Sequence, residues 1–328
     1  MSLAYVNLAG GQDELVFDGD SFLLDAAGKE IVTAGLNPGL YSQSNTTPAQ
    51  VDNYRQLFDV LVVGLRDYLR KTGQRKVVLG LSGGIDSALC AAIAKEAVGS
   101  ENVTGVLLPS RYSSEHSLSD AKLLAENLGI EHRLIEIDPA HKAFESSLSL
   151  SDLAQENIQA RIRAVILMGI SNSEGHLLIS TGNKSEVAVG YSTMYGDAAG
   201  GFAPIKDVYK TDVWKLAETY NQIQGFDAIP RNSITKPPSA ELRPGQLDQD
   251  SLPDYEVLDG ILYLLIEGKH TSAEIVGQGF DAQTVAKIDG MVRASEWKRS
   301  QGAIGTKTTA IAFGRGRRVP LTTRFGKL

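Results

Sequence analysis

The middle of the chain alternates between short apolar runs and longer segments with the spacing of an amphipathic helix. In chain order these segments are Lys76–Leu81, Asp86–Val98, Val103–Leu108, Leu118–Leu128, Arg133–Ile137, Leu153–Met168 and His176–Ser180. Continuous apolar strands that alternate with helices are typical of a parallel sheet covered on both faces. The pattern therefore predicts a doubly wound α/β fold, which binds its ligands at the carboxyl ends of the strands.

The front of the chain follows a different pattern. Short apolar runs fill residues 5–34, and glycines such as Gly10 and Gly11 punctuate them as turns would. This spacing predicts a β meander, and so few residues of strand cannot bury a core alone. We therefore expect this piece to pack on another part of the protein.

The remaining segments are mainly helical. Thr47 and Pro48 predict the N-cap and first residue of an amphipathic helix that runs to Gly73. Residues 229–254 are Pro-rich and irregular, and the tail from Gly302 is basic. The other predicted helices are Val208–Tyr220, Tyr255–Glu267, Ser272–Gly277 and Asp281–Arg299.

Composition narrows the classes of function. The 328 residues are 42% hydrophobic and carry a net charge of −7, which argues against a mainly electrostatic nucleic-acid or membrane-surface binder. The single cysteine, Cys90, excludes an intrachain disulfide and any Cys-rich zinc site, and fits a reducing cytoplasm. No apolar run reaches the length of a membrane span, and the start lacks the features of a signal peptide.

The most informative stretch joins an apolar strand directly to a helix. It reads Val-Val-Leu-Gly-Leu-Ser-Gly-Gly-Ile-Asp-Ser-Ala from Val77 to Ala88. Glycines let backbone N–H groups approach an anion, and the helix N-terminus adds its positive dipole end. Ser82 and Ser87 add hydroxyl donors, and Asp86 stands where magnesium on a polyphosphate would need an oxygen ligand. The alternative is a tight turn in which Asp and Ser act only as caps.

This stretch resembles the pyrophosphate loop of the N-type ATP pyrophosphatases, which cleave ATP to AMP and pyrophosphate. A second strand–helix junction at Leu177–Glu186, followed by residues 190–197 and 204–211, is similar to NAD synthetase, in particular the synthetase domain of the glutamine-dependent type. The resemblance covers about residues 48–325. It implies that ATP contacts Gly80, Leu81, Ser82, Gly83, Gly84, Ile85, Asp86, Ser87, Thr181, Lys210 and Ser239.

The resemblance also implies a reaction. ATP adenylates the carboxylate of nicotinic acid adenine dinucleotide, and ammonia then attacks the acyl-adenylate to give NAD and AMP. Magnesium would be held by Asp86 and Glu186. The implied contacts of the dinucleotide are Asn157, Arg161, Glu186, Tyr191, Ser192, Thr193, Met194 and Lys298. Ammonia-only members of the family carry a lysine at Met194 and an aspartate at Gly201, so the chain departs from them there.

Residues 5–21 resemble the end of a nitrilase-like glutaminase domain. The resemblance implies a remnant of that domain at 1–36, a linker at 37–50 and a synthetase domain at 51–328. The glutaminase nucleophile would lie upstream, and we interpret Cys90 as a buried small hydrophobe. The chain is therefore expected to use ammonia, with glutamine as the donor in a longer protein or through a glutaminase acting in trans. A truncated piece and a natural short form both remain open.

Other interpretations stay open at this point. Another ATP pyrophosphatase, such as a tRNA-thiolating enzyme or an amidotransferase synthetase subunit, would predict a cysteine pair and a basic RNA face. A nucleotide-binding module without catalysis is a third hypothesis. Lys206 and Asp207 are either a surface pair or part of the site, and Arg161 could be a surface arginine. The family further implies a cytoplasmic homodimer or larger homo-oligomer.

Overall fold

The computed structural model describes residues 1–42 and 52–322. The predicted helix start at Thr47 and Pro48 lies outside these residues. Helix α1 (Asn53–Thr72) instead begins after Asp52, whose side chain accepts a hydrogen bond from the Arg55 amide. The helix ends at Gly73, as expected. Within the described parts of the chain, no helix is long and apolar enough to cross a membrane.

A parallel four-stranded sheet forms the centre of the molecule. Its order is β8 (Glu131–Leu134), β7 (Val103–Leu107), β6 (Lys76–Gly80) and β9 (His176–Leu178). The first strand in sequence, β6, pairs with β7 on one side and β9 on the other, so the strand order reverses at β6. This confirms the predicted doubly wound α/β fold, and a crevice is expected where the order reverses.

Alternating residues of β6 point to opposite faces and so enter two different cores. Val77 and Leu79 belong to a core shared with α1, α2 (Ile85–Val98), α3 (Glu115–Leu128) and α7 (Lys210–Gln224). Val78 belongs to a second core beneath α5 (Asp152–Glu174), which packs on β6 and β9. Helices therefore cover both faces of the sheet.

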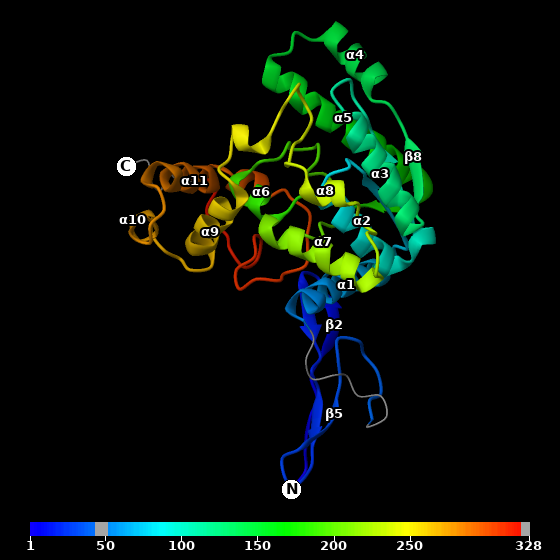
Figure 1. Cartoon of the computed structure of the whole chain (residues 1–328), viewed down its shortest axis with the longest axis vertical. Helices are drawn as coiled ribbons and strands as arrows, with labels where there is room; N and C mark the ends of the chain where they lie inside the picture. The colour runs from blue at the N-terminus through cyan, green and yellow to red at the C-terminus, as the bar shows by residue number, and fades with distance from the viewer. Residues whose placement is uncertain (43–51, 323–328) are drawn as a thin grey trace.

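A third core is built mainly from helices (Figure 1). Its elements are α6 (Lys184–Val189), α9 (Tyr255–Ile266), α10 (Ser272–Gly277) and α11 (Ala282–Ala294). The predicted helix over Asp281–Arg299 is divided, because a short α12 (Glu296–Arg299) follows α11 after Ser295. Two short helices were not predicted, namely α4 (Asp138–Ser147) and α8 (Arg231–Thr235) in the Pro-rich segment.

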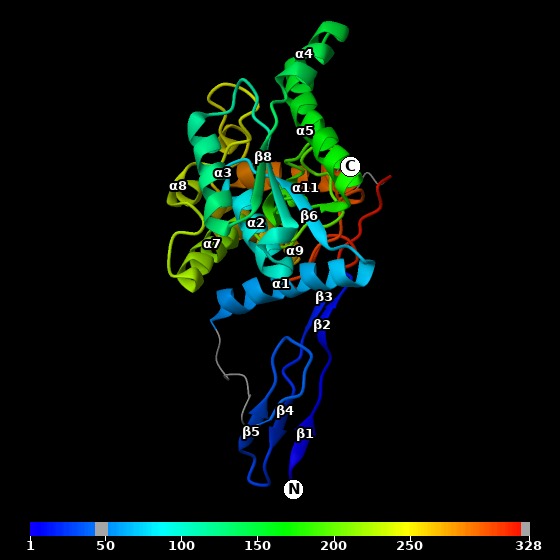
Figure 2. The same cartoon turned by 90° about the vertical axis from the view of Figure 1, so that its right-hand side faces the viewer.

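The first 34 residues form two small antiparallel sheets that extend away from the main body (Figure 2). One holds β1 (Leu3–Tyr5), β4 (Phe22–Leu24) and β5 (Glu30–Thr33); the other is a hairpin of β2 (Ala9–Gln12) and β3 (Leu15–Asp18).

The expectation that Gly10 and Gly11 form a turn is wrong, since both lie in β2. The physical reason is close packing on α1. The Gly11 amide donates to Asp67 Oδ2 at 2.8 Å, and a Cβ on Gly11 would lie 3.3 Å from the Val63 carbonyl oxygen. Lys71 Nζ also donates to the Gly11 carbonyl. The hairpin thus packs on another element, as its small size requires.

Candidate active site

A cavity of about 580 Å³ lies at the carboxyl ends of β6, β7 and β9. Its walls are the loop after β6, one face of α5, the segment after β9, and residues 236–248. Sixteen of the residues assigned to ligands by resemblance line it: Gly80, Leu81, Ser82, Gly84, Ile85, Asp86, Ser87, Asn157, Thr181, Glu186, Tyr191, Ser192, Thr193, Lys210, Ser239 and Lys298. Gly83, Arg161 and Met194 are absent from the lining.

The loop after β6 has a backbone that requires glycine at one position. Gly83 has a φ of 76°, and a Cβ there would lie 2.3 Å from the Ser117 carbonyl oxygen, so only glycine fits. Ser82 and Ser87 hydroxyls are 3.0 Å apart, and the Gly84 amide donates to Ser82 Oγ at 3.2 Å. Among the described residues no side chain caps α2 at Gly84, so its first N–H groups remain free for an anion.

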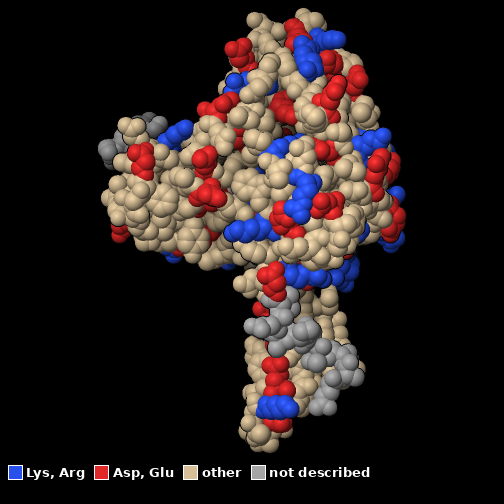
Figure 3. Space-filling view, in the orientation of Figure 1, with Lys and Arg blue, Asp and Glu red and all other residues tan. Residues whose placement is uncertain are grey.

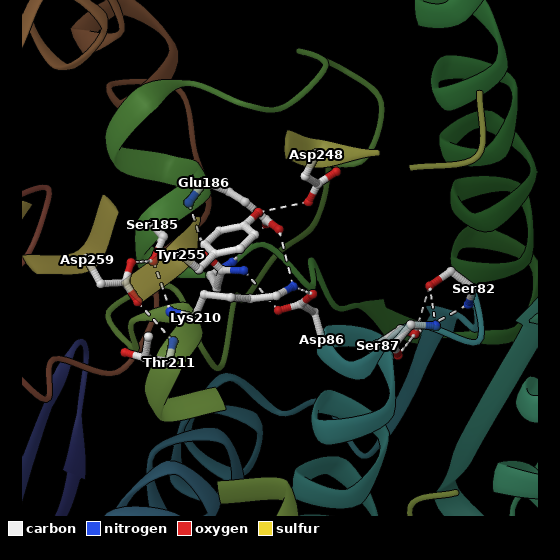
Figure 4. A network of polar contacts seen from close by, with 12 residues as sticks. Ser82, Asp86, Ser87, Ser185, Glu186, Lys210, Thr211, Asp248, Tyr255 and Asp259 are labelled. Carbon is white, nitrogen blue, oxygen red and sulfur yellow. Dashed lines mark hydrogen bonds and ion pairs between the residues drawn. The ribbon is translucent and has the colours of Figure 1, made fainter. Parts of the chain in front are cut away.

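Beside this loop, Asp86, Glu186 and Lys210 meet in what we call the open cluster (Figure 4). They come from the starts of three helices, α2, α6 and α7. Lys210 Nζ donates to Asp86 Oδ2 and lies 3.8 Å from Glu186 Oε1. The lysine side chain is 2% exposed, whereas the carboxylates are 19% and 18% exposed. The two predicted metal ligands are therefore brought together with part of their surface in reach of a ligand.

Asn183 fixes both carboxylates. It caps α6, because its Oδ1 accepts from the Glu186 amide at 3.0 Å while Glu186 Oε2 accepts from the Asn183 amide at 3.3 Å. Its Nδ2 donates to Asp86 Oδ1 at 2.9 Å. The side chain is fully buried. A single amide thus sets the relative position of the two acids.

Lys210 is positioned through its own backbone. Its amide donates to Ser185 Oγ at 2.9 Å, and that hydroxyl donates to Asp259 Oδ1 at 2.5 Å. The other carboxylate oxygen of Asp259 accepts from the Thr211 amide at 2.9 Å. Asp259 lies on α9, so the helical third core holds the start of α7 and with it the lysine (Figure 4).

The charged groups of the open cluster shift one another's pKa values. Burial, and then the charge of Asp86, raise the pKa of Glu186. Burial alone would lower the pKa of Lys210, but Asp86 and Glu186 outweigh it, and the pKa is raised. Burial also raises the pKa of Asp248, which lines the cavity and accepts from the Tyr255 hydroxyl at 2.8 Å. Burial therefore holds Glu186 and Asp248 closer to their neutral forms than exposed carboxyl groups would be.

Several residues assigned to the dinucleotide bond to one another across the elements that line the cavity. Thr193 Oγ1 donates to Asn157 Oδ1 at 2.7 Å, which joins α5 to the segment after β9. Lys298 Nζ donates to the carbonyls of Gly190 and Ser192, each at 2.7 Å, and burial lowers its pKa.

Two of the assigned residues pair with each other outside the cavity. Arg161 Nε donates to the Met194 carbonyl at 3.2 Å, and the Met194 side chain is buried.

Several cavity residues were not predicted from sequence. Arg163, Lys236, Glu241 and Asp248 all line the cavity. Glu241 accepts from Ser117 Oγ at 2.7 Å, which holds the segment at 236–247 against α3. Helical spacing on α5 could have pointed to Arg163, because positions 157, 160, 163 and 167 share a face.

The surface-pair interpretation of Lys206 and Asp207 is wrong. Asp207 is 3% exposed, and its carboxylate lies 2.8 Å from Lys184 Nζ. Lys206 is half-buried and donates to the Ala303 carbonyl at 2.5 Å. Their partners come from distant parts of the chain, which local sequence does not reveal.

Comparisons with known proteins identify the family. The family model described as NAD synthase matches residues 57–302. The glutamine-dependent NAD(+) synthetases of Thermotoga maritima and of a Synechocystis species are 46% and 48% identical to this chain over 99% and 98% of its length. The chain spans 65% and 61% of the length of those two proteins.

Solved structures agree with this assignment. A glutamine-dependent NAD+ synthetase from Acinetobacter baumannii, in complex with ADP, is 41% identical with a TM-score of 0.68, and the match covers 98% of this chain and 62% of that chain. An NMN synthetase from Francisella tularensis is 29% identical with a TM-score of 0.65, and the match covers 84% of this chain and all of that chain.

The family match takes in every part of the site. The loop at residues 81–84, which we call the phosphate loop after its resemblance, falls between residues 57 and 302, as do the open cluster and the segment at 236–248. The fold, the cavity at the strand ends and the sequence match agree: the chain belongs to the NAD synthase family.

Proposed function

We propose that this chain forms NAD by ATP-dependent amidation of nicotinic acid adenine dinucleotide, with ammonia as the nitrogen donor. The observation that carries the proposal is the open cluster, where Asp86, Glu186 and Lys210 converge beside the phosphate loop at the cavity wall. Similarity to NAD synthetases supports the choice of substrate.

The phosphate loop and Lys210 would bind ATP. Ser82, Ser87 and the uncapped start of α2 offer hydroxyl and backbone donors to the phosphates. Lys210 adds a buried positive charge that would neutralise negative charge as pyrophosphate leaves. Thr181 and Ser239 line the same cavity and would add further polar contacts.

Asp86 and Glu186 would hold magnesium. Carboxylate oxygens are the donors this ion prefers, and both groups retain exposed surface. In the described residues, no three His, Cys, Asp or Glu side chains converge to hold a metal unaided. Two protein ligands therefore fit an ion that also binds phosphate oxygens and water. When bound, magnesium would supply charge neutralisation on the triphosphate.

The reaction balances in two steps. A carboxylate oxygen of the dinucleotide attacks the α-phosphorus of ATP, and the bond to the β-phosphate oxygen breaks to release pyrophosphate. The nitrogen of ammonia then attacks the acyl carbon, AMP leaves with the bonding electrons, and the nitrogen loses a proton. The cavity walls would keep water from the acyl-adenylate, which water would otherwise hydrolyse.

The single cysteine supports ammonia rather than glutamine as the donor that this chain uses. Cys90 is completely buried on α2, and burial raises the pKa of its thiol. A thiol without access or thiolate character cannot attack glutamine.

Turnover tests the proposal directly. The protein is incubated with ATP, magnesium and the dinucleotide, with ammonium in one series and glutamine in another, and NAD, AMP and pyrophosphate are measured. We expect all three products in equal amounts with ammonium and no NAD with glutamine alone. Absence of NAD with ammonium would overturn the proposed reaction, and NAD from glutamine alone would overturn the choice of donor.

The likeness to an NMN synthetase provides the rival substrate. A parallel series replaces the dinucleotide with nicotinic acid mononucleotide at equal concentration. We expect kcat/KM to favour the dinucleotide. A preference for the mononucleotide would support the amidation chemistry but overturn the choice of the dinucleotide as substrate.

A further inference from the structure

Arg163 extends from the face of α5 that lines the cavity. Leu167, one turn further along this face, lies beside the last residue of β6: a Cβ on Gly80 would lie 3.6 Å from its Cδ1. Arg163 is therefore one helical turn away from this strand end. Its Nε donates to the Leu108 carbonyl at 3.0 Å, just beyond the end of β7. This bond anchors the guanidinium at the wall of the cavity.

The guanidinium has unused donors. Among the described residues, the Leu108 carbonyl is its hydrogen-bond partner, and no carboxylate lies within 4.0 Å of it. Burial lowers the pKa of Arg163 to about 10, although the charges of Glu241 and Asp197 act in the opposite direction. A desolvated cation that no carboxylate contacts is costly unless a ligand supplies the partner. Its four remaining N–H groups form the planar fork that suits phosphate.

Arg161 provides the contrast on the same helix. Two residues along a helix turn the side chain by about 200°. Arg161 accordingly lies away from the cavity lining and donates to the Met194 carbonyl. Sequence resemblance had assigned the substrate contact to Arg161, whereas the geometry of α5 offers Arg163.

We infer that Arg163 binds a phosphate group of a nucleotide held in the cavity, through its two Nη atoms. The inference rests on the proposed function, which brings two phosphate-bearing ligands to this cavity. The phosphate belongs either to ATP or to the dinucleotide, and separate binding measurements distinguish the two sources.

Binding without turnover provides the test. Dissociation constants are measured calorimetrically for magnesium–ATP and for the dinucleotide, each alone, with the wild-type protein, Arg163→Met and Arg163→Lys. Arg293→Met is the matched control, because Arg293 is a surface arginine on α11 paired with Asp289. We expect Arg163→Met to weaken one of the two ligands about tenfold or more, Arg163→Lys to weaken it less, and Arg293→Met to change neither.

Adenosine separates a phosphate contact from a structural effect. It carries the base and ribose of both ligands without phosphate, so Arg163→Met should leave its affinity unchanged. Unchanged affinity for both phosphate ligands, or an equal loss for adenosine, would overturn the inference. If Arg163→Met does not fold, Arg163→Lys decides by the same comparison. A wild-type protein that binds neither phosphate ligand would instead overturn the proposed function.

Discussion

Two buried lysines, 26 positions apart, are held in opposite ways. Lys184 and Lys210 begin α6 and α7, and each meets two carboxylates. Lys184 Nζ lies 2.8 Å from Asp207 and 2.5 Å from Glu267, and further donates to Thr309 Oγ1 and the Ile311 carbonyl. We call this the closed cluster. Lys210, in the open cluster, forms one hydrogen bond to a carboxylate and has its second acid 3.8 Å away.

We propose that the difference separates a structural use of charge from a ligand-binding one. The acids of the closed cluster are 4% and 6% exposed, and every donor of Lys184 has an acceptor. It joins α6 to the end of α9 and to the chain near Thr309. The acids of the open cluster keep 19% and 18% of their surface exposed. The same residue types therefore differ in whether other groups of the protein fill all of their hydrogen-bonding capacity.

The largest effect is expected from Asp86→Asn. The change keeps the shape of the side chain and removes the charge that would bind the metal, so pyrophosphate release should fall by roughly 10²–10³-fold or more. The free energy of unfolding should fall by less than the roughly 3–5 kcal/mol expected when a buried ion loses all its partners, because Glu186 still faces Lys210. Pyrophosphate release at the wild-type rate would contradict a ligand-binding role for the open cluster.

Lys184→Met should act on stability instead. It leaves Asp207 and Glu267 buried without their cation, which costs roughly 3–5 kcal/mol. Urea unfolding measures the loss, and Lys215→Met is the matched control, since the Lys215 side chain is 55% exposed. A loss as small as that of the control would mean that the closed cluster does not hold the fold.

Gly83→Ala tests the loop beside the open cluster. The added Cβ would meet the Ser117 carbonyl oxygen at 2.3 Å in a left-handed backbone, a strain of about 1–3 kcal/mol. We expect the KM for ATP to rise about tenfold. Gly277→Ala is the control, because nothing lies within 4 Å of its Cβ position. Equal KM values for the two variants would contradict an anion-binding loop.

The smallest effect concerns pH. Burial and Asp86 raise the folded-state pKa of Glu186 above its ordinary value of 4.5, so the folded protein resists its ionisation. The stability linked to this proton is present below that ordinary value and is lost as the pH rises through the folded-state pKa. Glu186→Gln removes the titration, so its melting temperature relative to wild type should rise between pH ~5 and pH ~8. A relative fall over that range would contradict the assigned direction.

The sheet could be predicted from sequence because its signal is local. Apolar runs such as Lys76–Leu81 are buried on both faces, and the loop after the first of them carries its glycines and serines in one stretch. Long-range packing leaves no such signal. From sequence, Gly10 and Gly11 predict a turn, whereas in the structure they lie in a strand that packs against α1.

The site was predictable where its residues follow strand ends. Asp86 and Glu186 each follow a strand end, so parallel strands bring them together. Asp207 was not predictable, since its partners near Thr309 lie about 100 residues away. Arg161 and Arg163 share one helix, and only the rotation of α5 decides which faces the cavity. On the face shown in Figure 3, acidic and basic side chains are interspersed. Composition gave only the net charge of −7 and not this distribution.

The most direct test of the two-cluster account changes one acid in each cluster. Magnesium–ATP is added to wild type, Asp86→Asn and Asp207→Asn, and the gain in unfolding free energy is measured. At 100 times the dissociation constant a ligand adds about 2.7 kcal/mol. The account predicts this gain for wild type and for Asp207→Asn, whatever their stability without ligand, and little or none for Asp86→Asn. A full gain for Asp86→Asn, or its loss in Asp207→Asn alone, would contradict it.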